Sequence, residues 1–327
     1  MRQETLAGSG FEKYRKKTRK EQFLEEMDRV IPWQELAEAI EPFYPNPQGA
    51  GRRPIGIERM LRVHFLQHWF KLSDPGAEEA LYDSQSMRAF VGIDLGREPV
   101  PDETTICKFR HLMEKHTLGA ELFRRVNRYL KENGLRVHRG TIVDATIISA
   151  PMSTKNRQRQ RDPEMRSTHK GGHWFFGMKA HIGVDSRTKL IHSVVGTSAN
   201  VHDSRVIGEL LHGEETRVWG DSAYTGKGEV IRAKAPRAQD YTQRQAVHHR
   251  QLTPQEHAAN RVKKRVRGKV EHVFGIMKHR LGFTKVRYKG LQKNTNFLLV
   301  CCALTNVLLA RRALLRSHCP GPQGSYA

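Results

Sequence analysis

The chain has 327 residues, in which 56 Lys and Arg stand against 34 Asp and Glu for a formal net charge of +22. Such an excess attracts polyanions and favours nucleic acid as the partner over a merely soluble basic protein or an acidic membrane surface. The four cysteines have no Cys-x-x-Cys spacing, which argues against a zinc ribbon or a disulfide framework.

The first third of the chain predicts helices. A basic run, Phe11–Lys20, precedes a helical stretch and a Pro/Gly-rich loop, and the helical pattern resumes from residue 55 to 116. We expect Asp74 to cap a helix that starts at Pro75, and Asp102 to cap another. An ordinary packed helical domain and a helix-turn-helix reading head both fit this pattern. In the second interpretation, DNA-facing side chains on the Asp102-capped helix are Thr104, Thr105 and Lys108.

After Gly134 the pattern changes to strands alternating with helices. Strands are predicted over residues 141–149, 175–185, 190–198 and 217–224, and a helix over 201–211. The basic segment 154–174 is expected to be a mobile loop. The run Phe297–Ala310 is too short to span a bilayer comfortably and predicts a buried helix, so we expect no membrane partner and a cytoplasmic protein.

Several polar and aromatic residues of this region have two interpretations. His202 and Asp203 are expected to form a helix cap rather than a catalytic dyad, and Asp162 and Glu164 to balance nearby arginines. The aromatic run at 174–176 could stack on a flipped base, but packing in the core is the favoured interpretation.

Two aspartates occupy strand positions where carboxylates are unusual. Asp144 interrupts the apolar strand TIVDATIIS, on the same face as Ile142 and Ile148, and Asp221 ends a second apolar strand before a turn. One such residue is usually a cap or a turn residue. Two of them in one basic domain favour a metal pocket, because neighbouring carboxylates repel unless a divalent cation joins them.

The segment Arg261–Phe283 predicts one amphipathic helix. Its core-facing stripe would be Val266, Val270, Val273 and Met277. A second face would carry Arg267, Glu271 and Lys278, with Lys264 beside them. A solvated i,i+4 ion pair explains Arg267 and Glu271 but not the surrounding positive charge. A helix whose Arg and Lys side chains bind DNA phosphates, while Glu271 binds a metal ion, explains both the ion pair and the surrounding positive charge.

These motifs, in the order TIVDAT, FGMKAHIGVD, TSANVHD, WGDSAYTG and RGKVEHVFGIMKHRLGF, resemble bacterial DDE insertion-sequence transposases of the group named after insertion sequence five. The similarity covers residues 11 to 312. It implies an α/β fold, with an RNase H-like catalytic core of a mixed central sheet flanked by helices, preceded by a helical N-terminal DNA-binding domain. The implied boundaries are 1–130, 131–315 and a disordered tail at 316–327.

The resemblance also implies a site. Asp144, Asp221 and Glu271 match the catalytic and metal-binding carboxylates of the family. Arg267, Glu271 and Lys278 match the signature around the family's Glu, although Lys264 stands where that signature has Tyr. The implied cofactor is two Mg²⁺ ions, with Mn²⁺ as a possible substitute.

The implied activity is binding of the terminal inverted repeats of an insertion sequence, followed by DNA cleavage and transfer to target DNA. The resemblance also implies that the protein forms a homodimer on DNA and is located at the nucleoid. Two alternatives stay open at this point. One is an RNase H-like nuclease that only hydrolyses, and the other is a DNA-binding protein whose catalytic centre has decayed.

Overall fold

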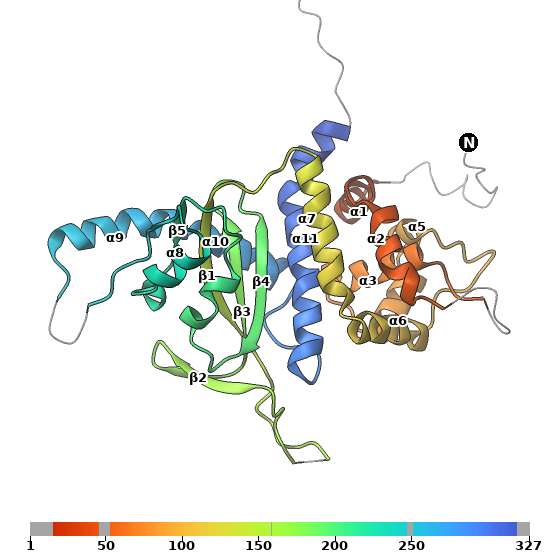
Figure 1. Cartoon of the computed structure of the whole chain (residues 1–327). Helices are drawn as coiled ribbons and strands as arrows, with labels where there is room; N and C mark the ends of the chain where they lie inside the picture. The colour runs from red at the N-terminus through yellow and green to blue at the C-terminus, as the bar shows by residue number, and fades with distance from the viewer. Residues whose placement is uncertain (1–15, 46–52, 158, 247–250, 319–327) are drawn as a thin grey trace, which may run out of the picture.

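A computed structural model describes residues 16–45, 53–157, 159–246 and 251–318 of the chain (Figure 1). Its helical N-terminal part packs against one side of two long helices, and a mixed sheet packs against the other. The predicted basic run and Pro/Gly loop lie partly outside the described residues, and the predicted disordered tail lies outside them from residue 319.

The N-terminal part is built from short helices with side-chain caps. Asp102 caps α6 as predicted, because its carboxylate accepts a hydrogen bond from Thr105 N at 2.6 Å. The predicted cap at Asp74 is wrong: Ser73 caps α4, and the Asp74 carboxylate instead accepts from Arg110 Nη2 at 2.8 Å. The helices are α1 (Arg19–Val30), α2 (Trp33–Ile40), α3 (Ile57–Phe70), α4 (Asp74–Asp83), α5 (Gln85–Val91), α6 (Glu103–Lys115) and α7 (Leu118–Glu132), with a 3-10 turn at Glu41–Phe43.

The central sheet joins antiparallel and parallel strands. β1 pairs antiparallel with β3 and parallel with β5, β5 pairs parallel with β6, and β3 also pairs with β2 and β4. β1 is therefore an interior strand, which explains why nearly all of it is buried. The strands are β1 (Gly140–Ser149), β2 (Arg166–Lys170), β3 (His173–Asp185), β4 (Ile191–Ser198), β5 (Arg217–Trp219) and β6 (Gln239–Asp240).

The longest helix, α11 (Leu291–His318), includes the predicted buried run and lies between the sheet and the N-terminal helices (Figure 1). By length and composition alone it could cross a membrane, but 61% of its most apolar window is buried within this fold. One continuous apolar cluster runs from the N-terminal helices through α7 and α11 to β1, β3 and β4. The two parts of the chain thus share a core.

The remaining elements cover the sheet and include three departures from prediction. The stretch 201–211 is not an α-helix but two 3-10 turns, η3 (Asp203–Arg205) and η4 (Ile207–Glu209). Its apolar residues Val206, Ile207, Leu210 and Leu211 lie in a second, smaller core. His202 caps η3, whereas Asp203, its predicted partner in the cap, pairs with Lys179. The predicted loop 154–174 contains β2 and the start of β3.

The third departure is in the segment 261–283. It is α9 (Pro254–Arg267), α10 (Lys269–Gly275) and a π-helix, η6 (Ile276–Arg280), rather than one helix. Leu281 N donates to Ile276 O, so one extra residue enters the last turn. The buried side chains of Leu281 and Phe283 stabilise this wider turn. The remaining elements are η5 (Ser222–Tyr224) and α8 (Gly228–Lys234).

Candidate active site

Asp144 and Asp221 lie next to each other because their strands are parallel neighbours. The register between β1 and β5 pairs Ile142 with Trp219. Two residues further along the chain are Asp144, in the middle of β1, and Asp221, just past the end of β5, so the two residues are neighbours. The charge of Asp221 is close enough to raise the pKa of Asp144. Asp221 also caps η5, where its Oδ1 accepts from Ala223 N at 2.9 Å.

The Asp144 carboxylate is buried and binds an arginine. Only 6% of the residue is exposed, and its Oδ2 accepts a hydrogen bond from Arg267 Nη1 at 2.7 Å. Burial raises the pKa of Asp144 to about 6, although the Arg267 guanidinium opposes that rise. A carboxylate held in this way is costly to keep charged without a cation, and Arg267 is the cation it meets in this structure.

Glu271 joins the same guanidinium from the next helix. Its Oε1 lies 3.3 Å from Arg267 Nη2, and its side chain is 66% exposed. Arg267 ends α9 and Glu271 lies in the first turn of α10. The break at Gly268 preserves the i,i+4 spacing, so the two predicted partners still meet. One guanidinium therefore links Asp144 to Glu271.

The positive residues predicted around Glu271 are only partly brought together. Lys264 is exposed on α9, one turn before Arg267. Lys278 lies in the π-helix, next to the fully buried Met277. Its neighbour is Lys170 of β2: burial, followed by the charge of Lys170, lowers the pKa of Lys278. The ammonium of Lys170 also lowers the pKa of Asp144, so the β2–β3 hairpin approaches the carboxylates.

A polar cluster that sequence reasoning missed lies beneath the carboxylates. The Tyr224 hydroxyl is buried and makes no hydrogen bond to any described residue. Burial, then the carboxylates of Asp203, Asp144 and Asp221, raise its pKa well above the ordinary value. Asp203 in turn pairs with Lys179 Nζ at 2.8 Å. The only sequence signal was the position of Tyr224, three residues after Asp221.

The side chains predicted to face DNA in the N-terminal part lie far from this site. Thr104 and Lys108 are exposed on α6 and Thr105 is half-buried. Thr104 Oγ1 donates to the capping carboxylate of Asp102 at 2.9 Å. In Figure 1, α6 lies on the opposite side of α7 and α11 from β1.

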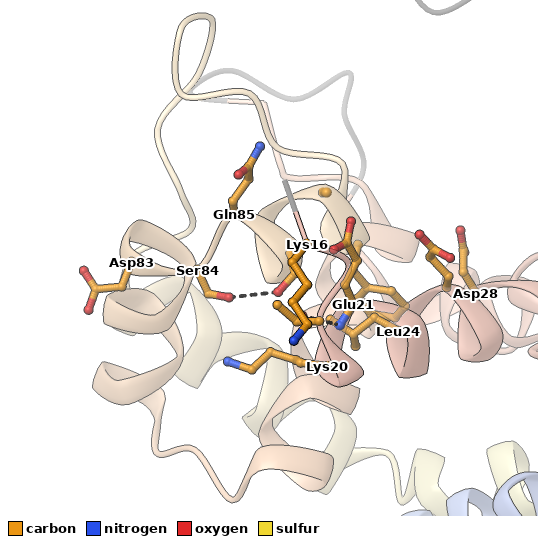
Figure 2. Close-up of a pocket in the computed structure, with 13 residues that line it drawn as sticks. Lys16, Lys20, Glu21, Leu24, Asp28, Asp83, Ser84 and Gln85 are labelled. Carbon is orange, nitrogen blue, oxygen red and sulfur yellow. Dashed lines mark hydrogen bonds between the residues drawn. The ribbon is translucent and has the colours of Figure 1, made fainter. Parts of the chain in front are cut away.

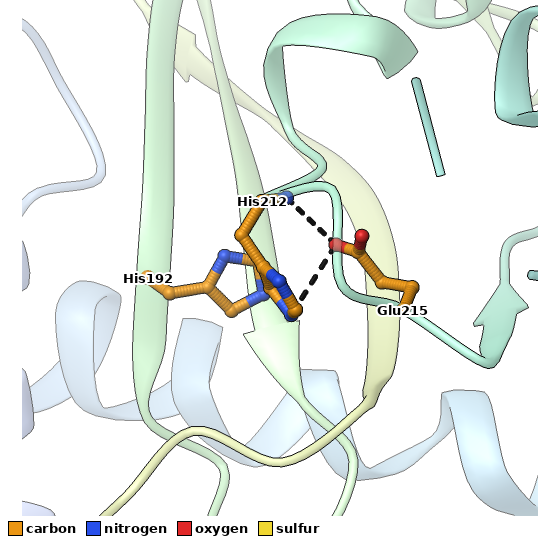
Figure 3. A group of neighbouring side chains, drawn as sticks. All are labelled: His192, His212 and Glu215. Carbon is orange, nitrogen blue, oxygen red and sulfur yellow. Dashed lines mark hydrogen bonds and ion pairs between the residues drawn. The ribbon is translucent and has the colours of Figure 1, made fainter. Parts of the chain in front are cut away.

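A second group of potential metal ligands lies near the start of β1 (Figure 3). Ligand atoms of His192, His212 and Glu215 lie within 4.8 Å of one another. The buried Glu215 carboxylate, however, already accepts from His212 N at 2.7 Å, Gly213 N at 2.8 Å and Thr141 Oγ1 at 3.1 Å. These bonds compensate its charge and fix the loop before β5. We therefore assign this group a structural role.

A surface pocket in the N-terminal part lies between the start of α1 and the α4–α5 turn (Figure 2). Lys16 and Lys20 line it together with acidic residues, among them Glu21 and Asp83. Two hydrogen bonds lie in its lining: Glu21 N donates to Thr18 Oγ1, and the Ser84 and Ser86 hydroxyls bond to each other. Its mixed charges do not form a cradle for phosphate.

Comparison with known families identifies the chain. Residues 135–307, more than half of the chain, match the family described as transposase DDE domain, and residues 12–112 match the family described as transposase domain (DUF772). One similar solved structure is a cryo-EM structure of a piggyBac transposase synaptic complex with hairpin DNA. It is 10% identical, with 90% of this chain and 73% of that chain covered at a TM-score of 0.47. The chain belongs to the DDE transposase family and is a DNA transposase with a mixed α/β core.

Proposed function

We propose that Asp144, Asp221 and Glu271 are the catalytic carboxylates and together hold two Mg²⁺ ions, which Mn²⁺ can replace. One observation carries this proposal: a single guanidinium, that of Arg267, neutralises Asp144 and Glu271, while Asp221 lies beside Asp144 at the next strand. Three carboxylates that share so little positive charge are a favourable site for divalent ions.

The donor set fits magnesium. All three ligands offer oxygen, which this hard cation prefers, and the exposed Glu271 leaves room for the waters that it keeps. Burial gives Asp144 a fixed position and a raised pKa, so a metal ion would gain from neutralising it. Asp144, Asp221 and Glu271 would hold the ions together.

In phosphodiester chemistry, bound Mg²⁺ ions stabilise the attacking and the leaving oxygen. The chain's own residues do the positioning. β1 and η5 fix the two aspartates, and Arg267, which pairs with Asp144 in this structure, would be the cation nearest to a DNA phosphate bound there. Lys264 and Lys278 extend that phosphate contact along α9 and the π-helix. Their charges attract the strand and set its register, without reading its sequence.

We also propose how the transposase acts on its element. The N-terminal region, residues 1–130, recognises the terminal inverted repeats, with Thr104, Thr105 and Lys108 at the DNA. Residues 131–315 cut and join the ends to target DNA. The protein works as a homodimer on the two ends, at the nucleoid, and belongs to the group named after insertion sequence five. The basic charge of the chain supports DNA binding along its surface.

The test uses the full-length variants Asp144→Asn, Asp221→Asn and Glu271→Gln. Each removes a metal-binding charge with little change in volume. We expect each to lose cleavage and joining of labelled element ends in Mg²⁺, while binding of the same DNA in EDTA is unchanged. Joining of the freed 3′ end to a second DNA separates a transposase from a nuclease that only hydrolyses.

Glu229→Gln is the matched control. Glu229 lies exposed on α8, carries the same charge and has no place in the proposed site. It should cleave and join at the wild-type rate. Near-normal joining by any one of the three site variants would remove that residue from the proposal.

A further inference from the structure

A cavity of about 490 Å³ lies between two segments that are far apart in the sequence. One wall is formed by residues between 150 and 162, in the connection from β1 to β2, and the other by residues 286–289, just before α11. A space of this size accommodates a small ligand or one unit of a longer chain. Four cationic side chains lie in its lining, those of Arg157, Arg161, Arg287 and Lys289. The cavity therefore suits an anionic ligand.

Little negative charge offsets these cations. The one carboxylate among the described lining residues, that of Asp162, is already engaged: its Oδ2 accepts from Gly290 N at 2.7 Å and its Oδ1 from Glu164 N at 3.1 Å. In the part of the chain that the structure describes, none of the three arginines forms an ion pair. The pocket of Figure 2 differs, because its lysines lie among several acids. An excess of cations in a concave site attracts a polyanion rather than a neutral ligand.

The first wall is anchored to the core of the fold. The Arg161 Nε donates to Met152 O at 3.0 Å, and the guanidinium lies 5.5 Å from the centre of the Phe176 ring. Phe176 is buried, as predicted for the aromatic run 174–176, whereas Trp174 is 72% exposed, so the prediction is wrong for that residue. The two terminal nitrogens of Arg161 make no hydrogen bond to a described residue. They are the pair of donors with which an arginine binds a phosphate.

The second wall is fixed by a buried asparagine. Asn294 is fully buried, and its Oδ1 accepts hydrogen bonds from the backbone N–H of Arg287 at 3.0 Å and of Tyr288 at 3.2 Å. The Arg287 guanidinium lies 5.9 Å from the centre of the buried Phe297 ring. The backbone of this wall therefore has its conformation before any ligand binds, which reduces the entropy that binding costs.

Strand β1 connects the cavity to the proposed carboxylate site. Ala150, in the lining, follows Asp144 by six residues, which at ~3.3 Å per residue corresponds to about 20 Å. The end of β1 is also bonded to the segment of the second wall, because Ser149 N donates to Thr284 O at 3.1 Å and Ser149 O accepts from Val286 N at 2.9 Å. Duplex DNA advances about 3.4 Å per base pair, so a duplex bound at the carboxylates reaches the cavity within roughly six base pairs.

We propose that this cavity binds the sugar–phosphate backbone of DNA about half a helical turn from the strand that is bound at the carboxylates. The inference rests on the proposed function and adds a DNA contact separate from that of α9 and the π-helix. The guanidinium groups of the three arginines hold neighbouring phosphates, with Lys289 as a further positive charge. Such contacts position the duplex and do not read its sequence. The element's end and the target DNA share this chemistry, and the experiment separates them.

The test removes one arginine from each wall of the full-length protein, in Arg157→Gln/Arg287→Gln, and measures binding in EDTA at several salt concentrations. One probe is a labelled duplex of the element's end, and the other is an unrelated duplex added to protein already bound to that end. We expect the slope of log affinity against log salt to fall by about two units, one for each lost phosphate contact. The fall appears with the first probe if the cavity holds the end, and with the second if it holds target DNA. Because no cleavage is measured, the result does not depend on whether the carboxylates catalyse.

Arg312→Gln/Arg316→Gln is the matched control. It removes the same charge from the exposed far end of α11, a helix of 28 residues that begins beside the cavity and is therefore about 40 Å long. This control should keep the wild-type slopes. Arg157→Lys/Arg287→Lys, which retains both charges in the cavity, should also keep most of the wild-type slope.

A change in the DNA gives an independent measurement on the unaltered protein. Uncharged methylphosphonates at the phosphates roughly six nucleotides from the cleavage or joining point should weaken wild-type binding. They should have little further effect in Arg157→Gln/Arg287→Gln, since both changes remove the same contact. The proposal is overturned if the double variant keeps the wild-type slopes with both probes, or if the methylphosphonates leave wild-type binding unchanged.

Discussion

The Arg267 guanidinium donates to the Asp144 carboxylate at 2.7 Å, which joins the end of α9 to the middle of β1. Both side chains are largely buried, at 17% and 9% exposed. Removing one partner of such a pair leaves an uncompensated charge.

We therefore expect Arg267→Gln to lower the free energy of unfolding by about 3 kcal/mol at pH 7.5 in EDTA. At pH 5 the loss should be smaller, because Asp144, with a pKa of about 6, then carries a proton. Mg²⁺ should recover part of the loss at pH 7.5. Urea denaturation at the two pH values measures this. An equal loss when the same change is made in Asp144→Asn would show that the pair is not the cause.

Buried histidines make the fold sensitive to acid. Burial lowers the pKa of His64 to about 4, compared with about 6.5 in the unfolded chain. Between these values the unfolded state binds the proton and the folded state does not. The free energy of unfolding therefore falls as pH falls from 6.5 to 4, by up to about 1.4 kcal/mol per pH unit for this residue.

His64→Leu should flatten that slope, as measured by denaturation midpoints at pH 7.5, 6 and 5. His173, exposed at the tip of the hairpin, is the control: His173→Leu should keep the wild-type slope. A slope unchanged by His64→Leu would mean that other groups govern acid unfolding.

The two faces of the π-helix can be tested with neighbouring residues. Met277 is fully buried, so Met277→Asp should place an unpaired charge in the core and unfold the domain. Met277→Leu, which keeps the apolar volume, should fold. Lys278→Ala should fold normally and lower the salt dependence of DNA binding by about one unit of log–log slope. Circular dichroism and binding titrations at several salt concentrations measure both. A stable, active Met277→Asp protein would show the faces reversed.

Gly119 lies where α7 packs tightly against α11. Its N–H donates to Asn296 Oδ1 at 2.8 Å, and an added Cβ would lie 2.5 Å from the Asn296 carbonyl oxygen. Gly119→Ala should therefore cost about 1–3 kcal/mol of stability. Gly275→Ala makes the same change in a helix where nothing lies within 4 Å, and should be neutral or stabilising. Thermal unfolding compares them, and equal midpoints would contradict the close approach.

Much of the site could be read from local patterns. Val, Ile and Thr around Asp144 define a buried strand, and the caps and apolar stripes of α6 and of 266–277 follow helical periodicity. The i,i+4 spacing places Glu271 beside Arg267. The link from Arg267 to Asp144 was not predictable, because it spans 123 positions and depends on how α9 packs on β1.

Other features could not be predicted because they depend on residues far away in the sequence or on where an element lies in the fold. Asp162 and Glu164 form no ion pair with an arginine among the described residues: they accept hydrogen bonds from Gly290 N at 2.7 Å and Leu291 N at 2.6 Å, at the start of α11. Composition marked Trp174 as apolar, yet the hairpin carries it past the end of β1 to where no core exists. The wide turn of the π-helix is set by buried residues that follow it.

The position of α11 has a consequence for how such transposases can diversify. Because this helix is packed on one side by the sheet and on the other by α7 and the N-terminal helices, the N-terminal part that we propose to recognise the element ends cannot be exchanged independently of the core. A graft that exchanged only the first helices for those of another element would have to match a foreign α7 to this α11, residue by residue. New end specificity should therefore arise from exposed substitutions on helices such as α6, or from exchange of α7 and α11 as a matched pair.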